Sequence, residues 1–147
     1  MGMTDSLLPS WMLWALLSAC FAALTAVFAK VGVEGVSADM ATLIRTAVIL
    51  PLLIGIVVAS GQSLAPSAVS GKTWLFLLLS GLATGASWLC YFRALKLGPA
   101  SQVAPVDKLS VVLVALFGVL FLGETLSGPN WLGVVLIAAG VILLAFK

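Results

Sequence analysis

The feature that most constrains this chain is a series of five continuous apolar stretches, each 18 to 20 residues long and separated by short polar connectors. Each stretch can cross the hydrocarbon core of a bilayer as a helix, which needs about 20 mostly apolar residues. Barrel strands would alternate apolar and polar residues, whereas these stretches are uniformly apolar. The sequence therefore predicts an all-α integral membrane protein with five transmembrane helices, at 11–29, 40–59, 73–92, 103–122 and 129–146.

Charge is scarce outside these spans as well as inside them. Only 8% of the residues are charged, against about 25% in an ordinary soluble domain. The few cations are scattered and form no basic run, which excludes a nucleic-acid surface. No connector is long enough to hold a folded domain. We therefore treat residues 1–147 as a single transmembrane domain whose surroundings are the lipid bilayer.

The basic residues that flank the spans are distributed unequally between the two membrane faces. We call face A the side with the amino terminus and the connectors after the second and fourth spans, and face B the opposite side. Face A has Lys72, and face B has Lys30, Arg93, Lys96 and Lys147. The positive-inside rule predicts that face B is cytoplasmic, with the amino terminus outside and the carboxyl terminus inside. Lys30 and Glu34, four residues apart at face B, are expected to form a solvated pair.

Catalysis has little support in this composition. The chain contains no histidine, and its five acids are spread along the sequence. No nucleophile–base pair and no cluster of metal ligands can be assembled from neighbouring positions. We therefore expect a protein that is not an enzyme and that needs no metal and no cofactor.

Charges inside the spans are the strongest functional indication. An ionisable group at the centre of a membrane helix costs at least about 2.5–3.5 kcal/mol, so such groups are candidates for function. Arg45 lies in the second span, and Asp107 and Lys108 lie near the start of the fourth, between Pro105 and the rest of the helix. One interpretation makes them a partly buried network that gates the inner mouth. The other makes Arg45 and Lys108 topology anchors that extend to the interface. Pro99 and Pro105 predict irregular first turns in this span.

The third span has a polar stripe. Ser80, Thr84, Ser87 and Tyr91 fall on one helical face, with Trp88 beside them. These residues are either the weakly polar wall of a substrate pathway or ordinary helix surface with hydroxyls bonded to their own backbone.

Glycines mark two possible packing seams. Gly81 and Gly85 in the third span, and Gly133 and Gly140 in the last, are spaced so that each pair shares a face. Small residues allow helix backbones to approach closely. We expect contacts at these seams, either within the chain or between two chains.

Three stretches together resemble a single EamA-type domain of the drug/metabolite transporter superfamily. They are ATLIRT, SGLATGASWLCYFRALKLGPASQVAPVDKLSVV and FLGETLSGPNWLGVVLIAAGVILL. The last also resembles the dimerising helix of the small multidrug resistance proteins, with Gly133 and Gly140 at the matching glycines. The resemblance implies that five spans are one half of an inverted-repeat transporter, so a second chain is needed. The first span lacks the acidic residue of the multidrug proteins, which puts proton-coupled export of cationic drugs in doubt.

These observations predict a subunit of an inner-membrane transporter that moves a small organic metabolite outward by alternating access. Its partner would be a second copy or a homologous five-helix chain, in a parallel or an antiparallel dimer. Two cations against one acid in the spans suit a substrate with a carboxylate. Two alternatives stay open: a small dimeric channel with the charges as a selectivity ring, and a membrane subunit that binds a partner without transporting.

Overall fold

The chain folds into apolar helices that match the five expected spans. The computed structural model describes residues 10–61 and 69–145, so Lys147 and the end of the last expected span lie outside the described residues. Five segments are long and apolar enough to cross a membrane, and the described residues form no strand. The all-α prediction is confirmed. The helices are α1 (Ser10–Gly32), α2 (Ala38–Ala59), α3 (Gly71–Leu97), α4 (Ala100–Asp107), α5 (Ser110–Phe121) and α6 (Gly128–Ala145); α4 and α5 together make the fourth span.

Local sequence determines where the helices begin and end. The side chains of Ser37 and Ser70 accept hydrogen bonds from backbone amides at the starts of α2 and α3, as serines at N-caps do. α3 continues five residues beyond the end expected for its span and stops at Leu97, where Gly98 and Pro99 follow. Proline has no amide hydrogen and fixes its own φ angle, so the chain turns here and starts α4.

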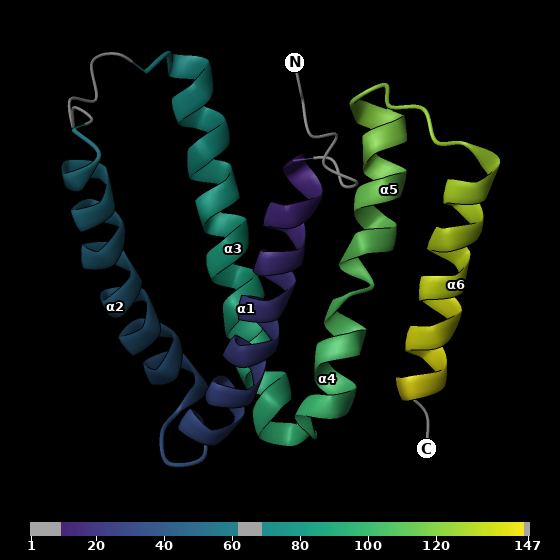
Figure 1. Cartoon of the computed structure of the whole chain (residues 1–147). Coiled ribbons are helices and arrows are strands. Elements are labelled where there is room, and N and C mark those ends of the chain that lie inside the picture. Colours follow the sequence, from purple (N-terminus) through teal and green to yellow (C-terminus); the bar gives the residue numbers. More distant parts are fainter. Residues whose placement is uncertain (1–9, 62–68, 146–147) are drawn as a thin grey trace, which may run out of the picture.

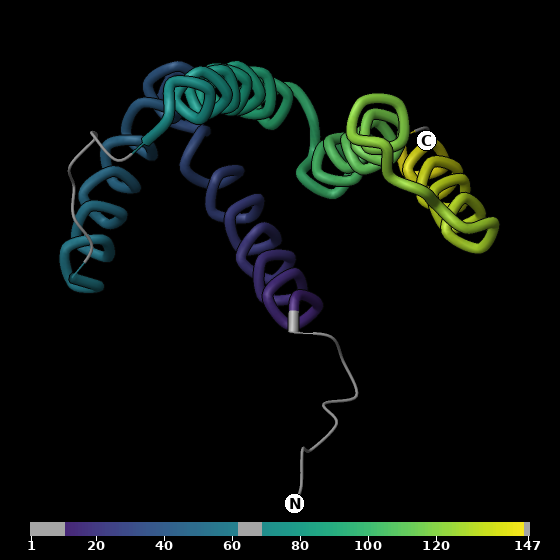
Figure 2. Tube along the Cα trace, turned by 90° about the horizontal axis from the view of Figure 1, so that it is seen from above, coloured from purple at the N-terminus to yellow at the C-terminus, as the bar shows by residue number. Residues whose placement is uncertain are grey.

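The helices converge at one end and diverge at the other (Figure 1). The α1–α2 and α3–α4 connections lie together at the lower end of this view, which is face B, and the carboxyl-terminal end of α6 points the same way. Seen end-on, α2, α3, α5 and α6 follow a curved row, and α1 projects from its concave side (Figure 2). α3 contacts α1, α2 and α4, while α6 contacts α4 and α5. α3 is therefore the central helix of the arrangement.

The buried core is small and lies at face B. Val33, Ala38, Phe92 and Leu95 form one cluster, in which Leu95 is 0% exposed and Val33 1%. Most other large apolar side chains, including those along α5, are exposed in the isolated chain. So much exposed apolar surface is unfavourable in water, so this surface requires lipid or another protein chain around it. The core thus fixes the face B end and leaves the rest of the bundle open.

Candidate functional site

The fourth span is broken at its charged residues. α4 ends at Asp107 and α5 begins at Ser110. Across the break the backbone amide of Lys108 donates to the carbonyl of Pro105 at 2.9 Å, and the amides of Leu109, Val111 and Val112 also donate to the carbonyl three residues earlier. Tighter turns of this kind inside a helix often mark functional hinges. The first turns of the span, which we expected to be irregular, are helical, and the irregular stretch instead follows Pro105 at the charged residues.

A polar cavity lies beside this break, and we call it the central cavity. Its volume is about 220 Å³. Four parts of the chain line it: α1 with Ala22 and Thr25, α2 with Arg45, α3 with Ser87, Trp88 and Tyr91, and the end of α4 with Asp107 and Lys108. Six of the eight residues proposed from sequence for a pathway or gate therefore meet in one place. Thr25 was not among them, although Ser18 and Thr25 are seven residues apart and so share one face of α1.

Arg45 stacks on an aromatic ring instead of pairing with an acid. Its guanidinium carbon lies 4.3 Å from the centroid of the Trp88 ring and 5.9 Å from that of Phe92. Such a cation–π contact contributes about 0.5–2 kcal/mol. Among the described residues no carboxylate lies within ion-pair distance of Arg45. The guanidinium is half-buried and lines the central cavity.

Asp107 and Lys108 form a local ion pair. The Lys108 ammonium donates to an Asp107 carboxylate oxygen at 3.2 Å, and the two side chains are partly exposed. Because the two residues are adjacent in the sequence, each compensates the charge of the other. The three intramembrane charges thus share one cavity, but only Asp107 and Lys108 are paired with each other.

The polar stripe of α3 divides into two halves. Ser87 and Tyr91 line the central cavity together with Trp88. Ser80 and Thr84 lie further toward face A and are exposed, and the Thr84 hydroxyl donates to the carbonyl of Ser80 at 2.9 Å. A hydroxyl bonded back to its own helix needs no further partner. The structure therefore does not bring Ser80 and Thr84 to the central cavity.

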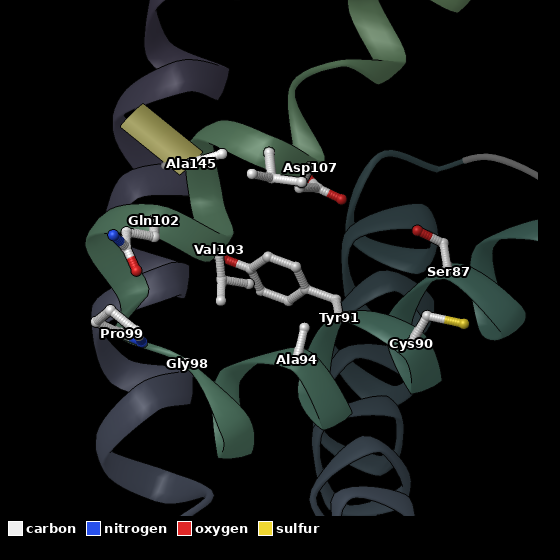
Figure 3. A pocket seen from close by; sticks show the side chains of 11 residues that line it. Ser87, Cys90, Tyr91, Ala94, Gly98, Pro99, Gln102, Val103, Asp107 and Ala145 are labelled. Atoms are coloured by element: carbon white, nitrogen blue, oxygen red, sulfur yellow. The ribbon is translucent and has the colours of Figure 1, made fainter. Parts of the chain in front are cut away.

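Two larger apolar grooves flank the central cavity. The α4 groove, of about 350 Å³, lies between α3 and α4 and reaches the end of α6; it shares Ser87, Tyr91 and Asp107 with the central cavity. Figure 3 shows the Tyr91 ring extending from α3 into this groove toward α4. The α1–α2 groove, of about 370 Å³, shares Thr25 and Arg45 with the central cavity. The three spaces are neighbours with the charged one in the middle.

Lys30 has a role that the sequence did not reveal. Its ammonium donates to the carbonyl of Leu95 at 2.6 Å and to that of Gly98 at 3.1 Å. In a continuing helix the amide of residue 99 would bond the Leu95 carbonyl, but Pro99 has no amide hydrogen. Lys30 supplies the missing donor from 65 residues away. The predicted solvated pair with Glu34 is wrong, because Lys30 is directed to the α3–α4 corner.

The four glycines singled out from sequence are not at tight contacts within the chain. A Cβ atom built on Gly81, Gly85, Gly133 or Gly140 would meet nothing within 4 Å among the described residues. Close helix packing inside the chain is therefore not the reason for these glycines. Their use between two chains stays a prediction.

The arrangement of broken apolar helices around a polar cavity is typical of a membrane transporter. The EamA-like transporter family matches residues 9–146, nearly the whole sequence, and the chain belongs to this family.

Several relatives bear names that agree with this assignment. A protein of Sinorhizobium sp, named as a transporter in the cobO 3' region, is 70% identical over 136 residues, which cover 92% of this chain and 96% of the relative. A probable 4-amino-4-deoxy-L-arabinose-phosphoundecaprenol flippase subunit, ArnE of Aeromonas hydrophila, is 32% identical over 66% of this chain and 95% of its own length. The transporter YojE of Bacillus subtilis is 28% identical over 71% of this chain and 35% of its own length. No solved structure matches the chain. The family and these names support transport by a multi-pass membrane protein over enzymatic catalysis.

Proposed function

We propose that this chain is a subunit of a transporter that exports a small organic metabolite across the inner membrane by alternating access. The observation that carries the proposal is the central cavity. Charged residues from α2 and from the break after α4 meet hydroxyl and aromatic side chains of α3 there. Ionisable groups held at a helix break inside a membrane are typical of substrate pathways.

A second chain completes the transporter, as either another copy or a homologous five-helix protein. The open arrangement of the helices and the exposed apolar surface of α5 support a partner. Gly133 and Gly140 on α6, which have free space beside them, offer a surface for it. The name of the Aeromonas relative, a flippase subunit, agrees with a protein that works as one part of an assembly.

Within the subunit, we assign the inner gate to Arg45, Asp107 and Lys108, close to the converged end of the helices. Trp88 and Tyr91 provide ring surfaces along the path, and Ser87 provides a hydroxyl. The stripe continues through Thr84 and Ser80 toward face A, where the helices diverge, so these two would line the outer part of the path once a second chain covers them.

Replacing Asp107 tests the gate. Asp107→Asn removes the charge that compensates Lys108 at the break and should abolish transport while insertion and helicity are retained. Asp39→Asn is the matched control, because Asp39 is also paired with a cation but lies exposed at face B. A metabolite enriched outside cells that overproduce the wild-type chain identifies the substrate, and flux in proteoliposomes then compares the variants. Wild-type flux in Asp107→Asn would refute the assigned gate.

The same flux measurement separates the rival functions. A carrier saturates with substrate and exchanges it, whereas a dimeric channel conducts far faster without saturating. A non-transporting subunit gives no flux alone and gains it only with a copurifying partner.

Orientation is tested with reporters fused to the carboxyl terminus that are active on one side of the membrane only. The bias of cations toward face B predicts activity of the cytoplasmic reporter alone. That result would exclude an inverted homodimer, and equal activity of both reporters would support one.

A further inference from the structure

We infer that the site takes an amphiphilic anion, with its carboxylate or phosphate group in the central cavity at Arg45 and its apolar part in the α4 groove. The inference rests on the proposed function and specifies the class of substrate. It follows from the state of Arg45, from the sizes of the three spaces and from the residues at their boundaries.

Arg45 is the charge in the cavity that has no acidic partner among the described residues. Lys108 is already paired with Asp107 at 3.2 Å. The guanidinium carbon of Arg45 lies over the Trp88 ring, 4.3 Å from its centroid, and the N–H groups of a guanidinium lie in its own plane, where they can bind an oxyanion in a bidentate manner. No buried side-chain nitrogen or oxygen in the described part of the chain lacks a hydrogen-bond partner. Any Arg45 donor without a protein partner is therefore not fully buried, and Arg45 lines the central cavity.

The central cavity is smaller than a typical site for a drug-sized ligand. Its 220 Å³ lies below the roughly 300–1,000 Å³ of typical ligand sites. The cavity shares lining residues with two spaces that are both mainly apolar. A ligand larger than the cavity that binds at Arg45 would extend into one of them and would therefore carry an apolar part next to its charged group.

The boundaries favour the α4 groove over the α1–α2 groove. Arg45 itself lies at the boundary with the α1–α2 groove. If the apolar part of the ligand extended to that side, it would desolvate the guanidinium. Tyr91, Ser87 and Asp107 lie at the boundary with the α4 groove, and the Asp107 carboxylate is already paired with Lys108. There the Tyr91 ring can cover the first carbons of the ligand's apolar part, and Val103 and Val106 of α4 line the space beyond.

Binding of monoalkyl phosphates to the full-length chain in phosphatidylcholine nanodiscs tests the inference. Equilibrium dialysis gives the affinity relative to the free aqueous concentration for butyl, hexyl and octyl phosphate, with octanol and octylammonium as uncharged and cationic probes. We expect the affinity to rise by about fourfold for each methylene group that becomes buried. Octanol and octylammonium should bind at least tenfold more weakly than octyl phosphate.

Matched variants locate the two parts of the ligand. Arg45→Gln should weaken all three phosphates at least tenfold, and Arg45→Lys should recover part of the loss, which also controls for folding. Val106→Trp fills the α4 groove and should weaken octyl phosphate at least tenfold, with butyl phosphate changed less. Ile44→Trp fills the α1–α2 groove and should leave both within about twofold of wild type. Val106 and Ile44 are both exposed, so each position has room for the larger ring.

The source of the anion is distinguished by competition. Phosphatidic acid in the nanodisc would displace octyl phosphate if the site takes lipid from the bilayer, and would leave it bound if the site takes a soluble amphiphile; either result supports the amphiphilic anion. Affinities that do not depend on Arg45, or a loss in Ile44→Trp without one in Val106→Trp, would overturn it. Binding by a chain that transports nothing would refute the proposed function alone. Transport of another solute without any binding of these phosphates would refute this inference alone.

Discussion

Removing the Lys30 side-chain charge should destabilise the α3–α4 corner by an amount that the structure allows us to estimate. In Lys30→Met the apolar stem remains and the two hydrogen bonds to the carbonyls of Leu95 and Gly98 are lost. Leu95 is 0% exposed, and Pro99 cannot donate to its carbonyl. That acceptor is left buried and unsatisfied, which costs about 1–3 kcal/mol.

The second acceptor contributes less. Gly98 is only half-buried, so water at the membrane face can replace the ammonium at its carbonyl, and the net loss is about 0.5–1 kcal/mol. Together the two losses should lower the free energy of unfolding by about 1.5–4 kcal/mol. Lys30→Arg keeps a donor on a long stem and should recover part of this stability.

The measurement is equilibrium unfolding of purified variants in mild detergent with increasing sodium dodecyl sulfate, followed by circular dichroism. Lys96→Met is the matched control, since Lys96 lies in the last turn of α3, is exposed and forms no ion pair within the described residues. Its loss should cost at most about 1 kcal/mol, through its favourable position at a helix carboxyl end. The reasoning would be refuted if the free energies of unfolding of Lys30→Met and Lys96→Met differed by less than about 0.5 kcal/mol. That difference is the usual deviation from additivity for independent sites.

Three further predictions concern face B. Leu95→Ala, at the centre of the buried cluster, should lower the free energy of unfolding by about 2–5 kcal/mol, and a loss below 1 kcal/mol in the same titration would show that the cluster is not tightly packed. The Asp39–Arg93 pair at 3.0 Å has side chains that are 65% and 62% exposed, so a double-mutant cycle should give a coupling of less than about 1 kcal/mol that falls with added salt; strong, salt-independent coupling would contradict this. In Gly98→Ala the new Cβ would lie 3.1 Å from a Val103 methyl group, which should lower the free energy of unfolding by about 1 kcal/mol. Adding Val103→Ala removes that close contact, so it should destabilise the Gly98→Ala variant less than it destabilises the wild type.

The membrane class and the number of spans follow from sequence because they depend on local properties. A continuous run of apolar residues satisfies its backbone only as a helix in lipid, whatever the rest of the chain does. Pro105 beside Asp107 also indicated an irregular stretch in the fourth span. The sequence did not place that stretch after Pro105, since the number of regular turns before it depends on what packs against α4.

Contacts between residues far apart in the chain were harder to predict from the sequence. Lys30 was interpreted from its neighbour Glu34, four residues away, while its actual partners lie 65 and 68 residues further along. The missing amide of Pro99 indicates that the carbonyl of Leu95 needs a donor, but does not indicate which residue supplies it. For the same reason the stripe on α3 was predicted as one surface, although only the half that faces α1, α2 and α4 lines the central cavity.

The sequence by itself determined that this protein is a set of five apolar membrane helices, and that the few charged residues within them are candidates for function. Hydrophobicity and helix-breaking residues act locally, so they can be interpreted one segment at a time. Only the tertiary structure decided that Arg45 stacks on Trp88 while Asp107 pairs with Lys108, and that the helices are joined at face B and open elsewhere. Those results depend on how helices far apart in the chain approach one another, which is a property of the packed bundle as a whole.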